Sequence, residues 1–256
     1  MFIFPEIDPI AFSLGPIKVH WYGLMYLAGF GGAWLIAYWR VLRFELPWTT
    51  NLISDLIFYC AFGVIIGGRL GYMLFYNTSE FFNKPWMILK IWEGGMSFHG
   101  GLIGVAVAIW IFARRFNKTY LETADFLAPL VPLGLGLGRI GNFINGELWG
   151  RVTDLPWAMV YRHVDAQPRH PSELYELGLE GFALFILVWV YAAVPRKPGA
   201  VAGVFLMGYA LCRLLAECFR EPDAQLNFIA FDWLTMGQLL SIPMLLGGFY
   251  LWWNKR

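Results

Sequence analysis

Seven stretches of this sequence are long and apolar enough, or nearly so, to cross a lipid bilayer, and they limit the fold more than any other feature. A helix that spans the hydrocarbon core, about 30 Å thick, needs roughly 20 mostly apolar residues, because each residue rises about 1.5 Å. The stretches lie at residues 19–39, 52–75, 96–113, 124–140, 174–194, 201–219 and 234–253. Since hydrophobic residues make up 58% of the chain and charged residues 14%, an ordinary soluble domain is excluded. We therefore predict an all-α fold, a polytopic membrane helix bundle of about seven transmembrane helices.

The fourth stretch differs from the others because it contains helix-breaking residues. Pro129 and Pro132 are followed by glycines at positions 134, 136 and 138. Such residues break a spanning helix or turn it back, and they are tolerated where protein or water satisfies the freed backbone groups. We therefore expect a break in this helix. No internal repeat or low-complexity linker divides the chain, so we predict one domain over residues 1–256.

Basic residues indicate how the bundle is oriented. They cluster after alternate stretches, at Arg40 and Arg43, at Arg114, Arg115 and Lys118, at Arg196 and Lys197, and at Lys255 and Arg256. Cytoplasmic loops carry an excess of Lys and Arg, so these clusters share the cytoplasmic side. This predicts a cytoplasmic C-terminus and an N-terminus outside. The outer connections are then residues 76–95, 141–172 and 220–233, and the longest, 141–172, is the predicted extracytoplasmic head.

Several functions are disfavoured by composition and spacing. The net charge is only +1, from 19 basic and 18 acidic residues, so we do not expect nucleic acid as a partner. The 3 cysteines lie in apolar runs, and the 4 histidines show no metal-ligand spacing, so we expect neither a metal nor a cofactor. Residues 136–141 match G-x-G-x-x-G but lack the strand-turn-helix context of a dinucleotide site.

Charged side chains inside the apolar stretches are the strongest functional signal. A charge at the bilayer centre costs at least about 2.5 to 3.5 kcal/mol, so it must face another charge, water or a ligand. Arg213 and Glu217, one helical turn apart, can form a structural ion pair. Arg69 and Arg139 have no acidic residue three or four positions away, so their partner must come from another helix or from a substrate. This favours an anionic ligand.

Helical spacing extends this candidate site toward the outer ends of the helices. Arg220 continues the face of Arg213 and Glu217, and Tyr209 lies one turn before Arg213. An arginine fork stays protonated and can bind a phosphate through two hydrogen bonds. Arg69 likewise shares a face with Tyr72 and Tyr76, although tyrosines at helix ends also serve as interface anchors. The pattern predicts an anion site near the outer leaflet.

His99 lies among glycines, in the sequence SFHGGLIG at residues 97–104. Glycines permit close helix packing or leave room for a substrate chain, so a structural and a functional histidine are both open. Histidine is the side chain best suited to take up a proton near neutral pH. A membrane transporter of an organic anion is also open, because intramembrane arginines and a broken helix would serve it too.

Residues 138–150, GRIGNFINGELWG, resemble the signature of the bacterial prolipoprotein diacylglyceryl transferases throughout their length. Further segments similar to this family are HWYGLMY at 20–26, GGRLGY at 67–72, GGMSFHGGLIG at 94–104, RHPS at 169–172, and the Arg213, Glu217 and Arg220 helix that leads into EPD at 221–223. The resemblance covers nearly the whole chain.

This resemblance implies an enzyme that catalyses the first step of lipoprotein maturation. It would transfer the diacylglyceryl group of phosphatidylglycerol to the lipobox cysteine thiol in the signal peptide of a preprolipoprotein, forming a thioether and releasing glycerol phosphate. The nucleophile then belongs to the substrate, so the enzyme needs no reactive cysteine of its own. The implied setting is the bacterial cytoplasmic (inner) membrane, with membrane lipid as a partner, and we expect a monomer.

The resemblance also implies roles for individual residues. Arg139 and Arg213 match essential arginines, to which we assign the phosphate and its developing charge. His99 matches an important histidine, which we assign to deprotonation of the thiol, directly or through water. The predicted substrate-binding residues are Tyr22, Asn142 and Glu147, then Gly150 for backbone room, and finally Arg69, Tyr76, His170, Tyr209, Glu217 and Arg220, for which ion pairing or shape is the alternative explanation.

Overall fold

The computed structural model describes residues 1–90, 94–222 and 234–255, and these form two compact units. One unit combines Met1–Ala33 with Asp125–Arg256, and the other is Trp34–Ala124. The first long helix, α1 (Trp21–Phe44), contributes residues to both. Each unit is described by itself.

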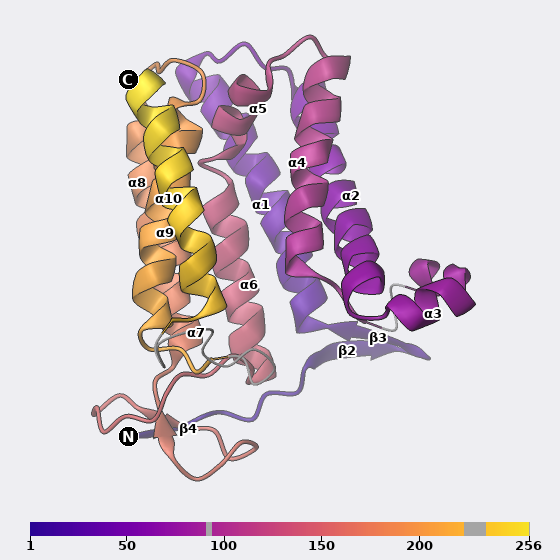
Figure 1. Cartoon of the computed structure of the whole chain (residues 1–256), viewed down its shortest axis with the longest axis vertical. Coiled ribbons are helices and arrows are strands. Elements are labelled where there is room, and N and C mark those ends of the chain that lie inside the picture. The colour runs from indigo at the N-terminus through magenta and orange to yellow at the C-terminus, as the bar shows by residue number, and fades with distance from the viewer. Residues whose placement is uncertain (91–93, 223–233, 256) are drawn as a thin grey trace. The chain divides into compact units, whose positions relative to one another are not determined.

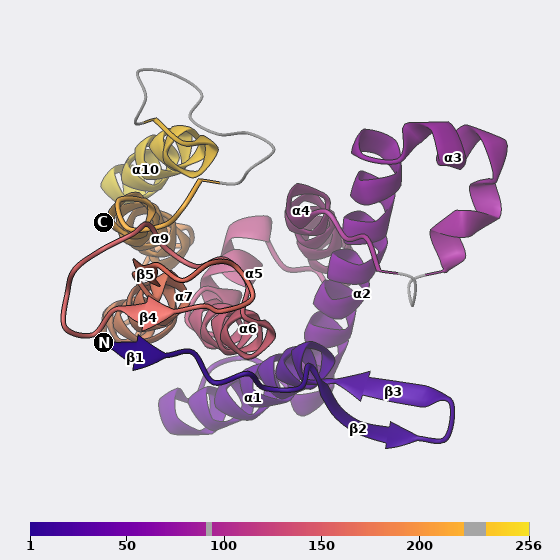
Figure 2. The same cartoon turned by 90° about the horizontal axis from the view of Figure 1, so that it is seen from below.

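In the unit Trp34–Ala124, two long helices pack tightly along glycine-lined faces (Figure 2). These are α2 (Thr50–Phe75) and α4 (Phe98–Arg115). A Cβ atom on Gly67 would lie 2.3 Å from the carbonyl oxygen of Gly100, and one on Gly104 would lie 2.0 Å from that of Gly63. Small residues spaced by one turn let helix backbones approach this closely, as in membrane helix pairs. Two short helices, α3 (Thr78–Asn83) and the 3₁₀ helix η1 (Pro85–Leu89), occupy the connection between them.

The other unit contains the remaining helices, which Figure 1 shows as a group of parallel and antiparallel rods. They are α6 (Val131–Asn145), α7 (Ser172–Glu176), the π-helical stretch η3 (Leu177–Ala183), α8 (Leu184–Tyr191), α9 (Ala200–Glu217) and α10 (Met236–Lys255). Helix α5 (Tyr120–Leu127), which contributes residues to both units, leads into α6 with a bend of 50°. The bend lies at Pro129 and Pro132, so the predicted break in this helix is confirmed.

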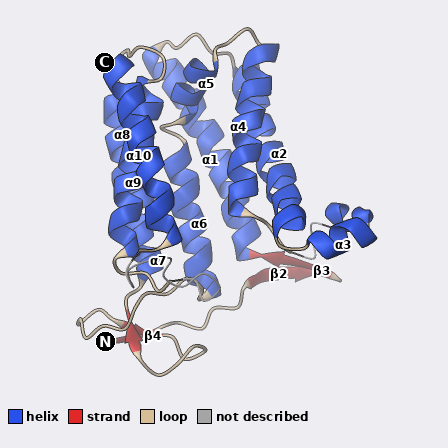
Figure 3. Ribbon diagram, in the orientation of Figure 1, coloured by secondary structure: helices blue, strands red, loops and turns tan. Residues whose placement is uncertain are grey.

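Two small sheets belong to the same unit and were not predicted (Figure 3). Strand β1 (Phe2–Ile3) pairs in parallel with β4 (Met159–Val160), which pairs antiparallel with β5 (Pro168–Arg169). Strands β2 (Ile10–Leu14) and β3 (Ile17–His20) form a hairpin, and α1 begins directly after it. The first predicted stretch, placed near residues 19–39, therefore begins with the last two residues of the hairpin, and its helix starts at Trp21.

Among the described residues, 4 helices are each long and apolar enough to cross a membrane, or up to 5 if the bent α5–α6 pair is one span. They are Thr50–Phe75, Phe98–Arg115, Ser172–Tyr191 and Ala200–Glu217. Large apolar side chains on such helices face outward, for example Phe58 at 60% and Val190 at 64% exposure, as expected of surfaces in contact with lipid. The all-α membrane bundle is confirmed. Helices α1 and α10 occupy the first and last predicted stretches, and the total of seven spans stays a prediction.

The predicted connections agree with the structure only in part. Helix α6 continues to Asn145, so the predicted head segment 141–172 shares its first residues with that helix. Helix α9 ends at Glu217, so the prediction that Arg220 continues its helical face is wrong. Most of the connection 220–233, Asp223 included, lies outside the described residues, as do residues 91–93 and Arg256. The head, the single domain and the orientation stay predictions.

Candidate functional site

Two buried glutamates lie inside the predicted apolar stretch 174–194, and a third lies directly before it. Glu173 and Glu176 belong to α7 and Glu180 to η3, and all three side chains are fully buried. Their spacing of three and four residues places them along one face of the helical run. Our sequence analysis overlooked this set, although the cost of a charge within residues 174–194 applies to carboxylates as it does to arginines.

Glu176 contacts three arginines that come from different parts of the chain. Its Oε2 atom forms an ion pair with Nη1 of Arg139 on α6, at 2.8 Å. Its Oε1 atom accepts a hydrogen bond of 2.9 Å from Nη1 of Arg213 on α9 and lies 3.5 Å from Nη1 of Arg220. Glu176 is therefore the hub of a buried ion-pair cluster.

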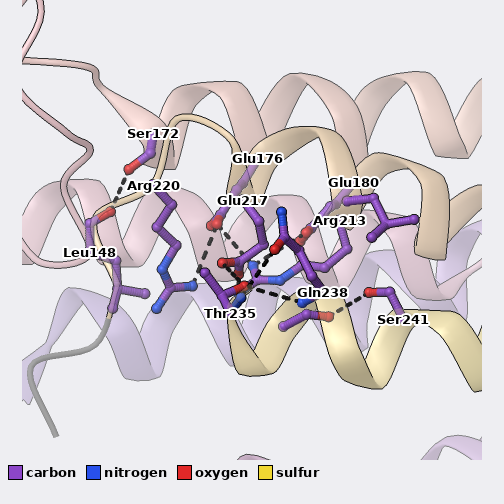
Figure 4. Close-up of polar contacts among 12 residues, drawn as sticks. Leu148, Ser172, Glu176, Glu180, Arg213, Glu217, Arg220, Thr235, Gln238 and Ser241 are labelled. Atoms are coloured by element: carbon purple, nitrogen blue, oxygen red, sulfur yellow. Dashed lines mark hydrogen bonds and ion pairs between the residues drawn. The ribbon is translucent and has the colours of Figure 1, made fainter. Parts of the chain in front are cut away.

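Two more glutamates complete this cluster. Glu180 accepts a hydrogen bond of 3.0 Å from Nη2 of Arg139, and its other oxygen lies 3.5 Å from Nη1 of Arg213. Glu217 forms the predicted ion pair with Arg213, one turn away on α9. Figure 4 shows the carboxylates of Glu176 and Glu217 directed toward Arg213 and Arg220.

Among the residues that the structure describes, three arginines meet three glutamates in these ion pairs, so their formal charges balance: Arg139, Arg213 and Arg220 with Glu176, Glu180 and Glu217. Our sequence argument required a partner for Arg139 from another helix or from a substrate. The structure provides the partner from another helix, so burial of Arg139 does not by itself imply an anionic ligand. An anionic ligand can contact only those N–H donors that the arginines leave exposed.

The arginines of the cluster are more accessible than the glutamates. The side chains of Arg139 and Arg213 are 16% and 14% exposed, whereas those of Glu176 and Glu180 are 0% exposed. A guanidinium has five N–H donors in a planar fork, so a group that is ion-paired on one edge can still donate on another. The cluster can therefore offer hydrogen-bond donors to an anion while its carboxylates stay buried behind them.

Asn142 and Glu147 lie beside this cluster at the end of α6. The side-chain amide of Asn142 donates to Glu147 Oε1 at 2.8 Å, and Asn142 Oδ1 accepts a long bond of 3.5 Å from Arg139 Nη1. Gly146, with φ +64°, ends the helix in a left-handed conformation, which turns the chain back so that the Glu147 N–H bonds to the Asn142 carbonyl at 3.1 Å. The structure thus brings these two predicted residues together with Arg139.

Tyr22, at the start of α1, packs against the same helix. A Cβ atom on Gly141 would lie 2.7 Å from Tyr22 Cδ2, so only glycine leaves room for the ring. The ring of Tyr26, one turn later, lies 5.2 Å from that of Tyr22. Tyr209 lies one turn before Arg213 on α9, where its ring packs 6.2 Å from Phe205 and against an apolar cluster.

Thr235, the residue directly before α10, bonds to Glu217, a contact that was not predicted. Thr235 Oγ1 donates to Glu217 Oε2 at 2.8 Å and also accepts a bond of 3.2 Å from the Gln238 N–H, while Gln238 Oε1 accepts one of 3.0 Å from the Thr235 N–H. This reciprocal pair is a capping box, which the T-x-x-Q pattern at 235–238 could have revealed. At Gly237, a Cβ atom would lie 2.3 Å from Glu217 Oε1, so the absence of a side chain leaves space for the carboxylate.

Gly150 joins the predicted head segment to the end of α9. Its N–H donates to the His170 carbonyl at 2.8 Å, and it forms an isolated β-bridge with Arg220. A Cβ atom there would lie 2.6 Å from the carbonyl oxygens of both His170 and Phe219. Glycine is therefore needed for this close backbone approach, which holds Arg220 beside the cluster.

His170 is held by aromatic side chains. Its Nδ1 atom lies 3.1 Å from the Tyr175 hydroxyl, and its ring lies 5.2 Å from that of Phe219. Burial, with a smaller effect of the charge on Arg151, holds the pKa of His170 below its usual value. The neutral imidazole is therefore favoured in the folded protein.

The other three predicted residues, Arg69, Tyr76 and His99, belong to the unit Trp34–Ala124. Arg69 is buried and donates to the carbonyl oxygens of Met87 (2.6 Å), Ile88 (3.2 Å), Gly94 and Gly95 (3.2 Å). Its charge is thus solvated by the backbone of the segment that precedes α4. These hydrogen bonds hold that segment against α2, and substrate binding by Arg69 stays a prediction.

His99 is exposed in the first turn of α4, next to the capping residue Ser97, whose hydroxyl accepts from the Gly100 N–H. Tyr76 ends α2, where its ring stacks 6.0 Å from that of Tyr72 and is 62% exposed. Both positions are accessible to a ligand, and the roles assigned to them stay predictions. In the part of the chain that the structure describes, no group of three or more His, Cys, Asp or Glu residues has the arrangement of a metal site.

Comparisons with known proteins agree with the resemblance seen in the sequence. The family model described as "Prolipoprotein diacylglyceryl transferase" matches residues 9–254. A protein of Legionella pneumophila strain Philadelphia 1 is 68% identical over 256 residues, which is 100% of both chains. One of Pseudomonas aeruginosa strain LESB58 is 55% identical over 258 residues, covering 100% of this chain and 97% of that protein. Both relatives are named phosphatidylglycerol–prolipoprotein diacylglyceryl transferase.

Proposed function

Because the chain belongs to the prolipoprotein diacylglyceryl transferase family, we propose that it transfers the diacylglyceryl group of phosphatidylglycerol to the cysteine thiol of a prolipoprotein. The sulfur forms a bond to the glycerol carbon that carries the phosphate ester. The carbon–oxygen bond breaks, its electron pair goes to the phosphate, and the thiol proton passes to a base. The transporter alternative finds no support among the relatives.

The observation that carries this proposal is the partly exposed pair of Arg139 and Arg213, held by buried carboxylates. The phosphodiester of phosphatidylglycerol bears one negative charge, and the departing glycerol phosphate gains a second. Fixed N–H donors directed at the position where charge develops stabilise a transition state without reorganising. We assign this role to Arg139 and Arg213, with Asn142 and Tyr22 as hydrogen-bonding residues for the headgroup.

The thiol is nucleophilic only as a thiolate, so the reaction also needs a proton acceptor. We assign this role to His99, which is exposed in the first turn of α4, because histidine is the side chain that most often serves as a general base. We further propose that the enzyme acts as a monomer in the bacterial cytoplasmic membrane, with its N-terminus outside and its C-terminus in the cytoplasm. The basic clusters that follow alternate helices support this orientation.

The experiment is transfer by the purified protein from phosphatidylglycerol to a peptide that contains a lipobox cysteine. We expect a peptide mass increased by one diacylglyceryl group, without added metal or nucleotide. Arg139→Gln should reduce turnover by at least about 10²-fold, the usual cost of losing one donor to a developing oxyanion. The matched control is Arg162→Gln, which removes an exposed arginine outside the cluster. A folded wild-type protein that forms no thioether, or an Arg139→Gln variant of normal rate, would contradict the proposal.

A further inference from the structure

The geometry points to Glu176 as a positioning residue that keeps the phosphate site electrically neutral, so that glycerol phosphate can leave after the transfer. This inference rests on the proposed function, because it concerns the product of that reaction. It starts from the charge balance of the cluster, in which Glu176 contacts Arg139, Arg213 and Arg220 at 2.8, 2.9 and 3.5 Å.

A site built from arginines alone would bind the product, glycerol phosphate, too tightly. The substrate headgroup is a phosphodiester with one negative charge, whereas glycerol phosphate is a monoester that carries nearly two at pH 7, since its second pKa is about 6. Each positive charge left uncompensated in a partly buried site attracts the product more strongly than the substrate. Three uncompensated arginines would therefore bind the product more tightly than the next lipid.

The buried glutamates remove this imbalance without blocking the site. Glu176 and Glu180 are fully buried behind Arg139 and Arg213, whose side chains remain partly exposed. The carboxylates contact both Nη atoms of Arg139 and of Arg213, and because each guanidinium has five N–H donors, some of these donors remain available to the ligand. The phosphate is then recognised by the direction of N–H groups more than by net charge.

Glu173 provides a matched control on the same helix. It is also fully buried, one turn before Glu176, but its Oε2 atom accepts a hydrogen bond of 3.0 Å from the Tyr161 hydroxyl. Glu173→Gln and Glu176→Gln therefore make the same chemical change at the same depth. Only the second removes a carboxylate that bridges the arginines.

The test is the inhibition constant of glycerol phosphate, measured on the purified enzyme during transfer from phosphatidylglycerol to a lipobox peptide. Glu176→Gln leaves one positive charge uncompensated, and we expect the product to inhibit it at about a tenfold lower concentration, with a lower kcat. Glu173→Gln should leave the inhibition constant unchanged. A merely structural role has the opposite sign, because a loosened site would bind the product more weakly. An unchanged or raised inhibition constant in Glu176→Gln would overturn the inference.

Two further measurements keep the inference testable if Glu176→Gln does not fold. Glu180→Gln removes the second buried carboxylate and should also lower the inhibition constant. On the wild type, glycerophosphoglycerol, a monoanion, and glycerol phosphate should inhibit within about threefold of each other, because a neutral site gains little from extra ligand charge. Tighter inhibition by glycerol phosphate of clearly more than about threefold would refute a neutral site. A wild type that makes no thioether would instead refute the proposed function.

Discussion

The close approach of two backbone segments at Gly150 makes a quantitative prediction for Gly150→Ala. The added methyl carbon would lie 2.6 Å from the carbonyl oxygens of His170 and Phe219, whereas ordinary van der Waals contact begins at 3.4 Å. Both strands of backbone must therefore move apart by several tenths of an ångström. Overpacking of this kind costs about 1–3 kcal/mol, because rigid backbone rather than a flexible side chain has to yield.

The same movement stretches two hydrogen bonds of 2.8 Å, from Gly150 to His170 and from Arg151 to Phe219, each worth about 1 kcal/mol. We expect Gly150→Ala to lower the free energy of unfolding by about 2–4 kcal/mol. It should also reduce turnover, because Arg220 is held beside Glu176 by the bridge to Gly150.

The assay is thermal unfolding in detergent, followed by lipid transfer at a temperature where the variant is folded. The matched control is Gly247→Ala on α10, where a Cβ atom would have no neighbour within 4 Å. Equal melting temperatures and equal turnover for the two alanine variants would refute the steric argument.

Two further predictions concern Arg69 and His170. Arg69→Lys keeps the charge but replaces a planar fork by a single ammonium group, which cannot serve four carbonyl oxygens; we expect faster proteolysis near residues 87–90 and a lower kcat at an unchanged KM for phosphatidylglycerol. A raised KM at unchanged proteolysis would support direct substrate binding instead. The pKa of His170 is lower in the folded than in the unfolded protein, so its contribution to stability is complete above about pH 6.5 and is lost as the pH falls through the folded pKa. His170→Asn should flatten the melting temperature between pH 7 and about pH 5, and an equal slope in both proteins would exclude this cause.

Helices and their interruptions were predictable from the sequence because they depend on local properties. Apolar length predicts α2, α4, α9 and the continuous run from α7 through η3 to α8 to within a few residues, and Pro129 with Pro132 predicts the bend between α5 and α6. Pro171 likewise directly precedes the start of α7. In each case a few neighbouring residues determine the backbone, so no knowledge of the fold is needed.

The end of α9 shows what local pattern cannot predict. The spacing of Arg213, Glu217 and Arg220 is helical, yet the helix stops at Glu217. Beyond it the chain pairs with the segment around Gly150, through the bridge to Arg220 and the bond from the Arg151 N–H to the Phe219 carbonyl. Those partners are distant in sequence, and long-range pairing overrides a local helical pattern. Arg220 still reaches Glu176, but from a bridge rather than from a helix.

The arginines of the site were predictable from the sequence, whereas its buried glutamates were missed. Arginines in apolar stretches stand out because no nearby acid explains them, whereas Glu176 and Glu180 find their partners only when three helices are packed together. Removing one member of such a buried set leaves an uncompensated charge, at a cost of about 3–5 kcal/mol, whichever sign is removed. Loss of activity or stability therefore cannot separate the arginines proposed to touch the phosphate from the glutamates behind them. The affinity for glycerol phosphate can separate them, because replacing a glutamate should raise this affinity and replacing an arginine should lower it.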